Sequence, residues 1–258
     1  MGNGNNNTFR EEVAIITGAG QGIGFEIASQ LCAKGAAVVI NDIDGVLATT
    51  AAQSLCAAGF RCVPFEGDVS QPLVIQQMVD VAVAQFGKLT IGIANAGITL
   101  FGEFLSYKPE ALNQVMQVNL TGSFFLAQAT ARQIIRQQSG GSILFTSSVT
   151  GHQAHKNLAA YGMTKAALEM LAKNLVVELS EYQVSVNAIA PGATLTERTT
   201  DDPDYIKTWS RITPMGKPAT VKDIANAALF FVSPDSRHIT GQSLVIDGGW
   251  TSVSPSPY

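Results

Sequence analysis

The feature that most constrains this chain is a repeated alternation of short apolar runs with longer helical patterns. Seven runs, rich in β-branched residues, cover residues 13–16, 36–40, 61–65, 89–94, 142–145, 184–189 and 243–246. The runs are apolar on both faces, which is typical of strands buried in a parallel sheet. The chain therefore has to cover both faces of such a sheet with its remaining segments.

Those remaining segments contain six helical patterns, which cover residues 22–34, 44–58, 71–86, 109–138, 159–181 and 221–233. Gly35, Gly59 and Gly87 follow three of them, where helices commonly end. Strand–helix alternation repeated this often predicts an α/β fold with a doubly wound parallel sheet of seven strands, of the Rossmann type. Because crossovers between parallel strands are right-handed, we expect helices on both faces.

We interpret residues 11–258 as a single domain, since no linker, repeat or low-complexity segment interrupts the pattern. Residues 1–10 are expected to form a disordered tail. The stretch 193–220 mixes charges, prolines and aromatics without a clean strand pattern. Two interpretations of this stretch stay open, a substrate lid and a solvated surface insertion.

Composition excludes several classes of protein. Sixteen Lys and Arg against 20 Asp and Glu give a net charge of −4, so no strong positive field exists to hold nucleic acid. No run of about 18 apolar residues predicts a membrane span, and the first residues lack the basic and apolar regions of a signal peptide. The three cysteines, Cys32, Cys56 and Cys62, fit a reducing cytoplasm and are expected to be small buried side chains.

A glycine-rich turn, Thr17 to Gly24, follows the first apolar run and opens the first helix. Its glycines permit a tight turn and a close approach of the backbone to a pyrophosphate, and the helix start offers free N–H groups. The expected contacts to a dinucleotide in this turn are Gly18, Gln21, Gly22, Ile23 and Gly24. The alternative is a turn that only packs the helix on the sheet.

Further residues follow the next three strands. Asp42 ends the second strand, where a carboxylate would bond the adenosine ribose and repel a 2′-phosphate. With the neutral Gln21, it favours NAD over NADP. Asp68 and Val69 follow the third strand and are expected near the adenine, although Asp68 equally suits a helix cap. The fourth strand ends in three small residues expected to border the cofactor, Asn95, Ala96 and Gly97.

A candidate catalytic set follows the fifth strand. Tyr161 and Lys165 have i, i+4 spacing, which puts both on one face of a helix. A lysine ammonium stabilises a neighbouring phenolate, so the pair can move a proton to or from a substrate oxygen. Ser148 closes the fifth strand, and its hydroxyl is placed to hold the same oxygen. A Tyr-x-x-x-Lys pair alone is common on exposed helix faces. The catalytic interpretation therefore depends on the predicted sheet, in which Ser148 ends the neighbouring strand.

From about residue 10 to residue 250 the chain resembles the short-chain dehydrogenase/reductase family, in its single-domain, NAD-preferring branch. The motifs that carry the resemblance are Thr17-Gly18-x-x-x-Gly22-x-Gly24, Asn95-Ala96-Gly97, Asn119, Ser148, Tyr161-x-x-x-Lys165, Pro191-Gly192 and Asp247-Gly248-Gly249. The family usually has a second asparagine where this chain has Ala94, which puts no catalytic role in doubt.

The resemblance implies hydride transfer at nicotinamide, with Tyr161 as acid/base, Lys165 also bonding the nicotinamide ribose, and Ser148 orienting the substrate. It further implies that Asn119 holds a water that relays protons; the alternative is a polar kink in a long helix. Cofactor contacts are also implied for a second group, Pro191, Gly192, Thr194 and Thr196, with helix capping as the alternative for Thr196. No metal is expected, since His152 and His155 have no acidic or Cys partner nearby in sequence.

The function expected from these residues is an NAD-dependent oxidoreductase that interconverts a small polar secondary alcohol, such as a sugar or polyol, and its ketone. The polar segment 151–158 motivates this substrate class, whereas Phe101, Phe104 and Leu105 would suit an apolar pocket. The alternative is a 3-oxoacyl-[acyl-carrier-protein] reductase. Ser139 and Tyr182 stand where such reductases offer arginines to an acidic carrier protein, which lowers that alternative.

The sequence also bears on a non-enzymatic role and on the oligomeric state. A non-enzymatic dinucleotide-binding regulator generally lacks the tyrosine or the lysine, and this chain keeps both. A homotetramer is expected from the resemblance and from two apolar helices, 109–138 and 159–181, which contain Met116, Phe124, Phe125, Leu168, Leu171 and Leu175. The tail 250–258 is expected to add a second interface.

Overall fold

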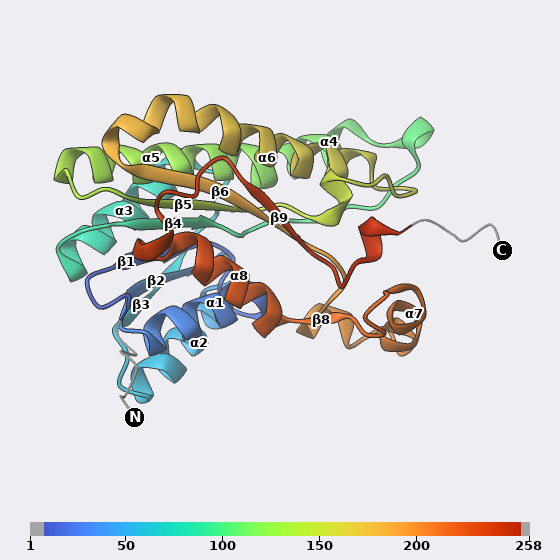
Figure 1. Cartoon of the computed structure of the whole chain (residues 1–258), viewed down its shortest axis with the longest axis horizontal. Helices are drawn as coiled ribbons and strands as arrows, with labels where there is room; N and C mark the ends of the chain where they lie inside the picture. Colours follow the sequence, from blue (N-terminus) through green and yellow to red (C-terminus); the bar gives the residue numbers. More distant parts are fainter. Residues whose placement is uncertain (1–7, 254–258) are drawn as a thin grey trace.

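The computed structural model describes residues 8–253 and has a seven-stranded parallel sheet at its centre (Figure 1). The strands are β1 Val13–Ile16, β2 Ala37–Asp42, β3 Cys62–Glu66, β4 Ile91–Ala94, β5 Gly141–Thr146, β6 Val184–Pro191 and β9 Ser243–Ile246. Their order across the sheet is β3-β2-β1-β4-β5-β6-β9. The prediction of a doubly wound seven-stranded sheet is confirmed, and the order reverses direction between β1 and β4, beside which such folds bind ligands.

Helices cover both faces of the sheet (Figure 1). One layer contains α1 Gly22–Ala33, α2 Gly45–Ala57 and α8 Val221–Val232, and the other contains α3 Pro72–Phe86, α5 Ser123–Gln137 and α6 Ala159–Leu179. Side chains of each strand alternate between the layers, because successive residues of a strand point to opposite faces. In β1, Ala14 and Ile16 pack with the first layer and Val13 and Ile15 with the second. This two-sided burial explains why the central strands β1, β4, β5 and β6 are mostly apolar.

The long helix predicted for residues 109–138 is interrupted. The structure has α4 Pro109–Met116, a π-helical turn Gln117–Gly122, and then α5. The buried Asn119 lies within that turn, and its amide bonds the backbone N–H and carbonyl of Ile98 at 2.9 and 3.1 Å. The wider turn brings this side chain to the loop after β4, a tertiary contact that helical periodicity does not reveal.

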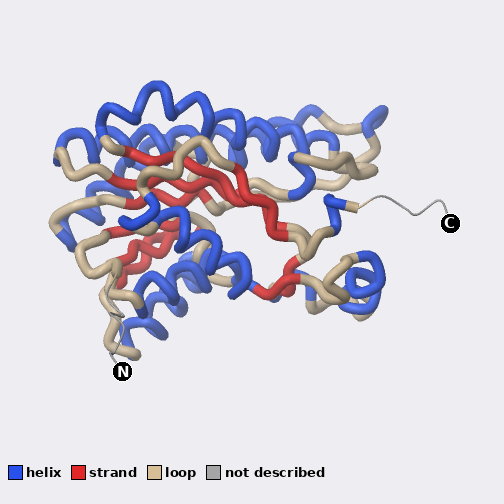
Figure 2. Tube along the Cα trace, viewed as in Figure 1, coloured by secondary structure: helices blue, strands red, loops and turns tan. Residues whose placement is uncertain are grey.

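The segment 193–220 contains strands that the sequence pattern did not predict. β7 Thr194–Leu195 and β8 Ala219–Thr220 form a small parallel pair outside the main sheet. Between them along the chain comes α7 Tyr205–Ile212, which lies to one side of the pair (Figure 2). Two-residue strands are too short for any periodic signal. The expected tail 1–10 is also revised at its end, because Phe9 is buried in the core, and residues 1–7 lie outside the described residues.

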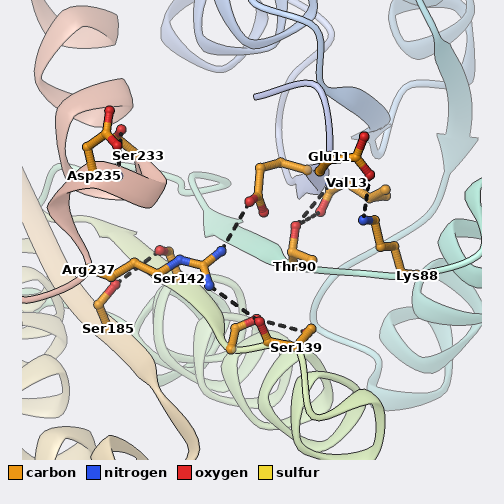
Figure 3. A network of polar contacts seen from close by, with 12 residues as sticks. Glu11, Val13, Lys88, Thr90, Ser139, Ser142, Ser185, Ser233, Asp235 and Arg237 are labelled. Atoms are coloured by element: carbon orange, nitrogen blue, oxygen red, sulfur yellow. Dashed lines mark hydrogen bonds and ion pairs between the residues drawn. The ribbon is translucent and has the colours of Figure 1, made fainter. Parts of the chain in front are cut away.

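A polar network ties the amino ends of the strands together (Figure 3). Arg237 donates to the buried Glu12 at 3.1 Å and to the carbonyl of Ser139 at 3.4 Å. A cavity of about 490 Å³ lies at the same edge, lined partly by Arg10, Arg61 and Lys88. These contacts are far in the fold from the carboxyl ends of the strands, where the predicted site residues gather. None of the helices in residues 8–253 has the length and apolarity needed to cross a membrane.

Candidate active site

The glycine-rich turn connects β1 to α1 at the carboxyl edge of the sheet. Gly18 has φ +60°, and a Cβ there would lie 2.9 Å from the Cα of Ala96. A Cβ at Gly24 would lie 2.5 Å from the carbonyl oxygen of Gly18, so any side chain would push the helix off the turn. Gln21 precedes α1 without capping it, and the first turn of α1 contains no acidic residue. The helix start therefore keeps its N–H groups for an anion such as a pyrophosphate.

The residues after β4 hold this turn in place. Asn95 donates through Nδ2 to the carbonyls of Thr17 and Gly18 at 3.0 and 2.9 Å. The hydroxyl of Thr17 accepts the backbone N–H groups of Asn95 and Ala96, both at 3.1 Å. The side chain of Asn95 thus fixes the glycine-rich turn. The small residues Ala96 and Gly97 leave space next to that turn.

Asp42 lies at the end of β2, next to the same turn. One carboxylate oxygen accepts the N–H of Gly20 at 3.0 Å, and the other accepts the N–H of Asp44 at 3.2 Å. The first bond orients a negative charge beside the turn, which is where the ribose of a dinucleotide would lie. The predicted place of Asp42 thus agrees with the geometry.

Asp68 and Val69 follow β3 as expected. The carboxylate of Asp68 accepts the N–H and the hydroxyl of Ser70 at 2.9 and 2.8 Å, so it orders the turn before α3. The helix itself begins after Gln71, which makes Asp68 a turn residue rather than the helix cap. Val69 is buried, and its carbonyl packs against Gly122 in the π-helical turn.

The segment from Pro191 to Thr196 leaves β6 and crosses toward the glycine-rich turn. The N–H of Gly192 bonds the carbonyl of Ile246, and the hydroxyl of Thr194 donates to the carbonyl of Gly192 at 3.0 Å. Thr196 caps the short helix Glu197–Thr199. Its Cβ also lies within 3.8 Å of the position that a Cβ at Gly22 would take. Both interpretations of Thr196 therefore have geometric support.

Tyr161 and Lys165 lie on one face of α6. The Nζ atom of Lys165 is 5.4 Å from the centroid of the Tyr161 ring, and it donates to the carbonyl of Thr146 at 2.7 Å. Lys165 is only 3% exposed, so its ammonium is held between the tyrosine and the end of β5. This arrangement fixes the lysine side chain beside the phenol ring of Tyr161.

Ser148 follows β5 and faces the same region. Its backbone is extended, and its hydroxyl oxygen accepts the N–H of Thr150 at 3.2 Å. A Cβ at Gly162 would lie 2.8 Å from the carbonyl of Thr150, so the segment after Ser148 packs directly against the residue after Tyr161. The structure thus brings the serine segment and the Tyr161–Lys165 pair together at the carboxyl edge of β5.

Asn119 borders this set through Gly97. A Cβ at Gly97 would lie 3.3 Å from Nζ of Lys165 and 3.4 Å from Oδ1 of Asn119. The amide of Asn119 bonds Ile98, and its Nδ2 also donates to the hydroxyl of Thr164 at 3.1 Å. Its side chain therefore fixes the loop after β4 and the widened helical turn, as the kink interpretation expects. The proton-relaying water remains a prediction.

Sequence reasoning did not single out Ser147 and Glu169. Their side chains bond each other at 2.6 Å, and Glu169 also pairs with His152 at 2.9 Å. The spacing in the sequence could have pointed to Glu169, because it lies four residues after Lys165, as Lys165 lies four residues after Tyr161. His152 has an acidic partner after all, at a distance in sequence that its local surroundings do not reveal.

An aromatic cluster joins residues 193–220 to the loop before α6 through Trp250. Trp250 stacks on His155, with ring centroids 5.0 Å apart, and meets the edge of Trp209 from α7 at 5.1 Å. Burial raises the pKa of Tyr205, whose hydroxyl donates to the carbonyl of Thr194 at 3.3 Å. The segment 193–220 thus contacts Trp250, which stacks on the loop before α6, and its Thr196 and Glu197 approach the glycine-rich turn at Gly22.

Asp247 anchors the strand end from which Trp250 comes. Burial raises the pKa of Asp247, but donors from Thr251 and Gly249 outweigh burial and hold that pKa below its usual range. The hydroxyl and N–H of Thr251 both lie 2.7 Å from one carboxylate oxygen. The motif Asp247-Gly248-Gly249 therefore has a local structural role at the edge of the site.

Comparison with known proteins places this constellation in a family. A family model described as "Enoyl-(Acyl carrier protein) reductase" matches residues 18–251. An L-rhamnose-1-dehydrogenase of Scheffersomyces stipitis is 35% identical over 250 residues, which cover 92% of this chain and 95% of that protein. The chain belongs to the short-chain dehydrogenase/reductase family. The resemblance seen in its motifs is thereby confirmed.

Solved structures of this short-chain dehydrogenase/reductase family agree over nearly the whole chain. A short-chain type dehydrogenase/reductase from Mycobacterium marinum has a TM-score of 0.90 and 31% identity, covering 95% of this chain and 98% of its own. A gluconate 5-dehydrogenase from Burkholderia cenocepacia, in complex with NADP and tartrate, has a TM-score of 0.89 and 33% identity, covering 96% and 99%. The chain is an oxidoreductase that acts on CH–OH groups with a nicotinamide cofactor.

Proposed function

We propose that this enzyme is an NAD-dependent dehydrogenase of a small polyhydroxylated substrate, a sugar or polyol, with Tyr161 as its acid/base. The observation that carries the proposal is the meeting of Tyr161 and Lys165 with the end of β5, beside a turn that fits a dinucleotide. That set performs proton transfer at a substrate oxygen without a metal.

Each residue of the set has a separate task. When bound, the nicotinamide supplies or takes the hydride. Tyr161 gives a proton to the substrate oxygen, or removes it in the oxidative direction, and the Ser148 hydroxyl bonds the same oxygen. The ammonium of Lys165, held by the Thr146 carbonyl at 2.7 Å, stabilises the phenolate and bonds the nicotinamide ribose. Asn119 holds the relay water beside Lys165 in this scheme.

The cofactor contacts follow the same edge of the sheet. The pyrophosphate lies at the start of α1, against Gly18, Gln21, Gly22, Ile23 and Gly24. The adenosine lies near Asp42, Asp68 and Val69. The nicotinamide side is bordered by a third group, Asn95, Ala96, Gly97, Pro191, Gly192, Thr194 and Thr196. Asp42 supports NAD, because its carboxylate is fixed by the Gly20 and Asp44 N–H groups where a 2′-phosphate would come.

Three observations support a polar substrate. Relatives are named for L-rhamnose and gluconate, both rich in hydroxyl groups. The loop between Ser148 and Tyr161 is rich in polar side chains, in keeping with the sequence-based expectation. The apolar residues Phe101, Phe104 and Leu105 are 71–97% exposed, so they do not wall a closed apolar pocket. A site with hydrogen-bonding groups rejects analogues that lack hydroxyls, because its own groups lose their partners.

A substrate panel with NAD⁺ or NADH, followed by absorbance at 340 nm, tests this proposal. The panel contains L-rhamnose, gluconate, alditols, cyclic diketones, a steroid and a 3-oxoacyl thioester. We expect the best kcat/KM with a sugar, sugar acid or alditol. The steroid or the thioester being a hundredfold better than every polyol would contradict the proposal. The thioester also tests the carrier-protein alternative, which Ser139 and Tyr182 disfavour.

We propose that residues 193–220 act as a lid within a single domain spanning residues 11–258. The contact of Trp209 with Trp250 and the approach of Thr196 to Gly22 support this interpretation, since they join the segment to two sides of the site. We also propose a cytoplasmic location. The three cysteines are few and odd in number, which suits a reducing compartment. Burial raises the pKa of Cys32 to about 12 and makes it unreactive.

We propose a homotetramer, with α5 and α6 forming one interface. Met163, Met170 and Val177 recur every seven residues on α6 and are 50%, 55% and 89% exposed. Phe124 of α5 is 44% exposed. Phe124 was among the expected residues, whereas on α6 the two methionines and the valine replace the expected Leu168, Leu171 and Leu175, which pack inward. A two-fold axis would cover such a stripe. Residues 254–258 of the proposed second interface lie outside the described residues.

The oligomer prediction is tested by light scattering at micromolar concentration. We expect the mass of four chains for the wild type and a smaller species for Met170→Glu, because a charge would be buried at the proposed interface. Met215→Glu, also at an exposed methionine but away from α6, is the matched control and should leave the mass unchanged. A wild-type monomer would refute the proposal.

A further inference from the structure

The catalytic face of α6 continues beyond Lys165. Tyr161, Lys165 and Glu169 are spaced i, i+4 and i+8, so they lie along one side of the helix. The side chain of Glu169 is 12% exposed and is directed at the segment that follows β5. A carboxylate in such a protected position needs hydrogen-bond donors, because burial without them costs free energy.

Ser147 is the first donor. Its hydroxyl lies 2.6 Å from Oε1 of Glu169 and 2.9 Å from the carbonyl oxygen of Lys165. A serine hydroxyl has one hydrogen, and the shorter contact to the carboxylate is in the range of charge-assisted bonds. Ser147 is 2% exposed, and its N–H also bonds the carbonyl of Ile189 at 2.7 Å. Water therefore does not replace these partners.

His152 is the second donor. Its Nε2 atom lies 2.9 Å from the same carboxylate oxygen, and its side chain is 32% exposed. The neighbouring Gly151 lies so close to α6 that a Cβ there would come within 3.1 Å of Oε1 of Glu169. One carboxylate thus joins the catalytic helix to the end of β5 and to the loop that borders the substrate.

These contacts determine how Ser148 is presented. Ser148 has an extended backbone, in which successive side chains point to opposite sides. Because the Ser147 side chain is tied to α6, the rotation of the chain at Ser148 is fixed as well. The Thr146 carbonyl is tied to the same helix through Lys165 at 2.7 Å. Rotation here would move the Ser148 hydroxyl away from an oxygen held by Tyr161.

We propose that Glu169 and Ser147 are positioning residues, which hold the Ser148 hydroxyl in register with Tyr161 and Lys165. The proposal rests on the family reaction and not on the substrate class. Glutamine keeps the length of the Glu169 side chain and an acceptor oxygen for Ser147, whereas alanine removes both. Glu178, exposed on the same helix, provides a matched control.

The test compares Glu169→Ala, Glu169→Gln, Ser147→Ala and Glu178→Ala. Steady-state rates are measured with the best substrate of the panel and with diacetyl as a second carbonyl probe. We expect at least a tenfold lower kcat for Glu169→Ala and Ser147→Ala, with the KM for cofactor unchanged within twofold. Glu169→Gln is expected within threefold of the wild type, and Glu178→Ala at wild-type rate. If the proposed polar substrate class is wrong, the best substrate of the panel will be a different compound. The ratios of variant to wild-type kcat are expected to stay the same.

A second measurement requires no substrate. Hydrogen exchange of residues 148–154, followed by mass spectrometry, should become at least fivefold faster in Glu169→Ala and stay unchanged in Glu169→Gln. Three results would overturn the proposal. They are a Glu169→Ala kcat within twofold of wild type, an equal loss in Glu169→Gln, and unchanged exchange of residues 148–154 in Glu169→Ala.

Discussion

Tyr161→Phe is expected to lower kcat by about 10²- to 10⁴-fold, the usual contribution of a positioned acid/base. The change removes only the hydroxyl that exchanges a proton with the substrate. The ring beside the Lys165 ammonium, 5.4 Å from its centroid, is retained. NADH binding and folding should therefore survive. Steady-state rates, NADH fluorescence titration and thermal unfolding measure the three quantities.

The matched control for this prediction is Tyr182→Phe. Tyr182 is 41% exposed and lies beyond the end of α6, so losing its hydroxyl should leave kcat unchanged. If Tyr161→Phe keeps more than a tenth of the wild-type kcat, another residue is the acid/base. A variant that loses NADH binding together with turnover would instead give Tyr161 a role in holding the cofactor.

Sequence patterns predicted the sheet well because its central strands, β1, β4, β5 and β6, are buried on both faces. The alternation of Val13 and Ile15 with Ala14 and Ile16 between two cores leaves no polar position in β1. The π-helical turn was missed for a physical reason. Its cause is the contact of Asn119 with Ile98, which joins distant segments and has no periodicity. β7 and β8 were missed because two residues carry no pattern.

In the site, too, features set by local spacing were predicted, and contacts between distant segments were not. Tyr161, Lys165 and the glycine-rich turn follow from spacing along one element. The pairing of Ser147 and His152 with Glu169 depends on how the end of β5 packs on α6, which only the fold specifies. The two hydrogen bonds from Asn95 to the carbonyls of Thr17 and Gly18 likewise form only because β1 and β4 are neighbours in the sheet.

The cofactor proposed for this chain differs from the one bound in a solved relative. The Burkholderia cenocepacia relative was solved with NADP, and that relative does not decide what this chain uses. Here Asp42 holds the glycine-rich turn through Gly20 at 3.0 Å and brings a full negative charge to it. Two like charges close together in a partly desolvated site repel, so we expect a 2′-phosphate to bind less well than a free ribose.

Asp42→Asn is therefore expected to relax the proposed preference for NADH over NADPH by roughly 1–3 kcal/mol. Asparagine keeps the shape and one acceptor oxygen for the Gly20 N–H, so the turn should survive while the charge is lost. The ratio of kcat/KM for the two cofactors measures the effect. Asp80→Asn, exposed on α3, is the control and should leave the ratio unchanged. A wild-type enzyme that prefers NADPH tenfold would show that the Asp42 charge does not govern cofactor choice.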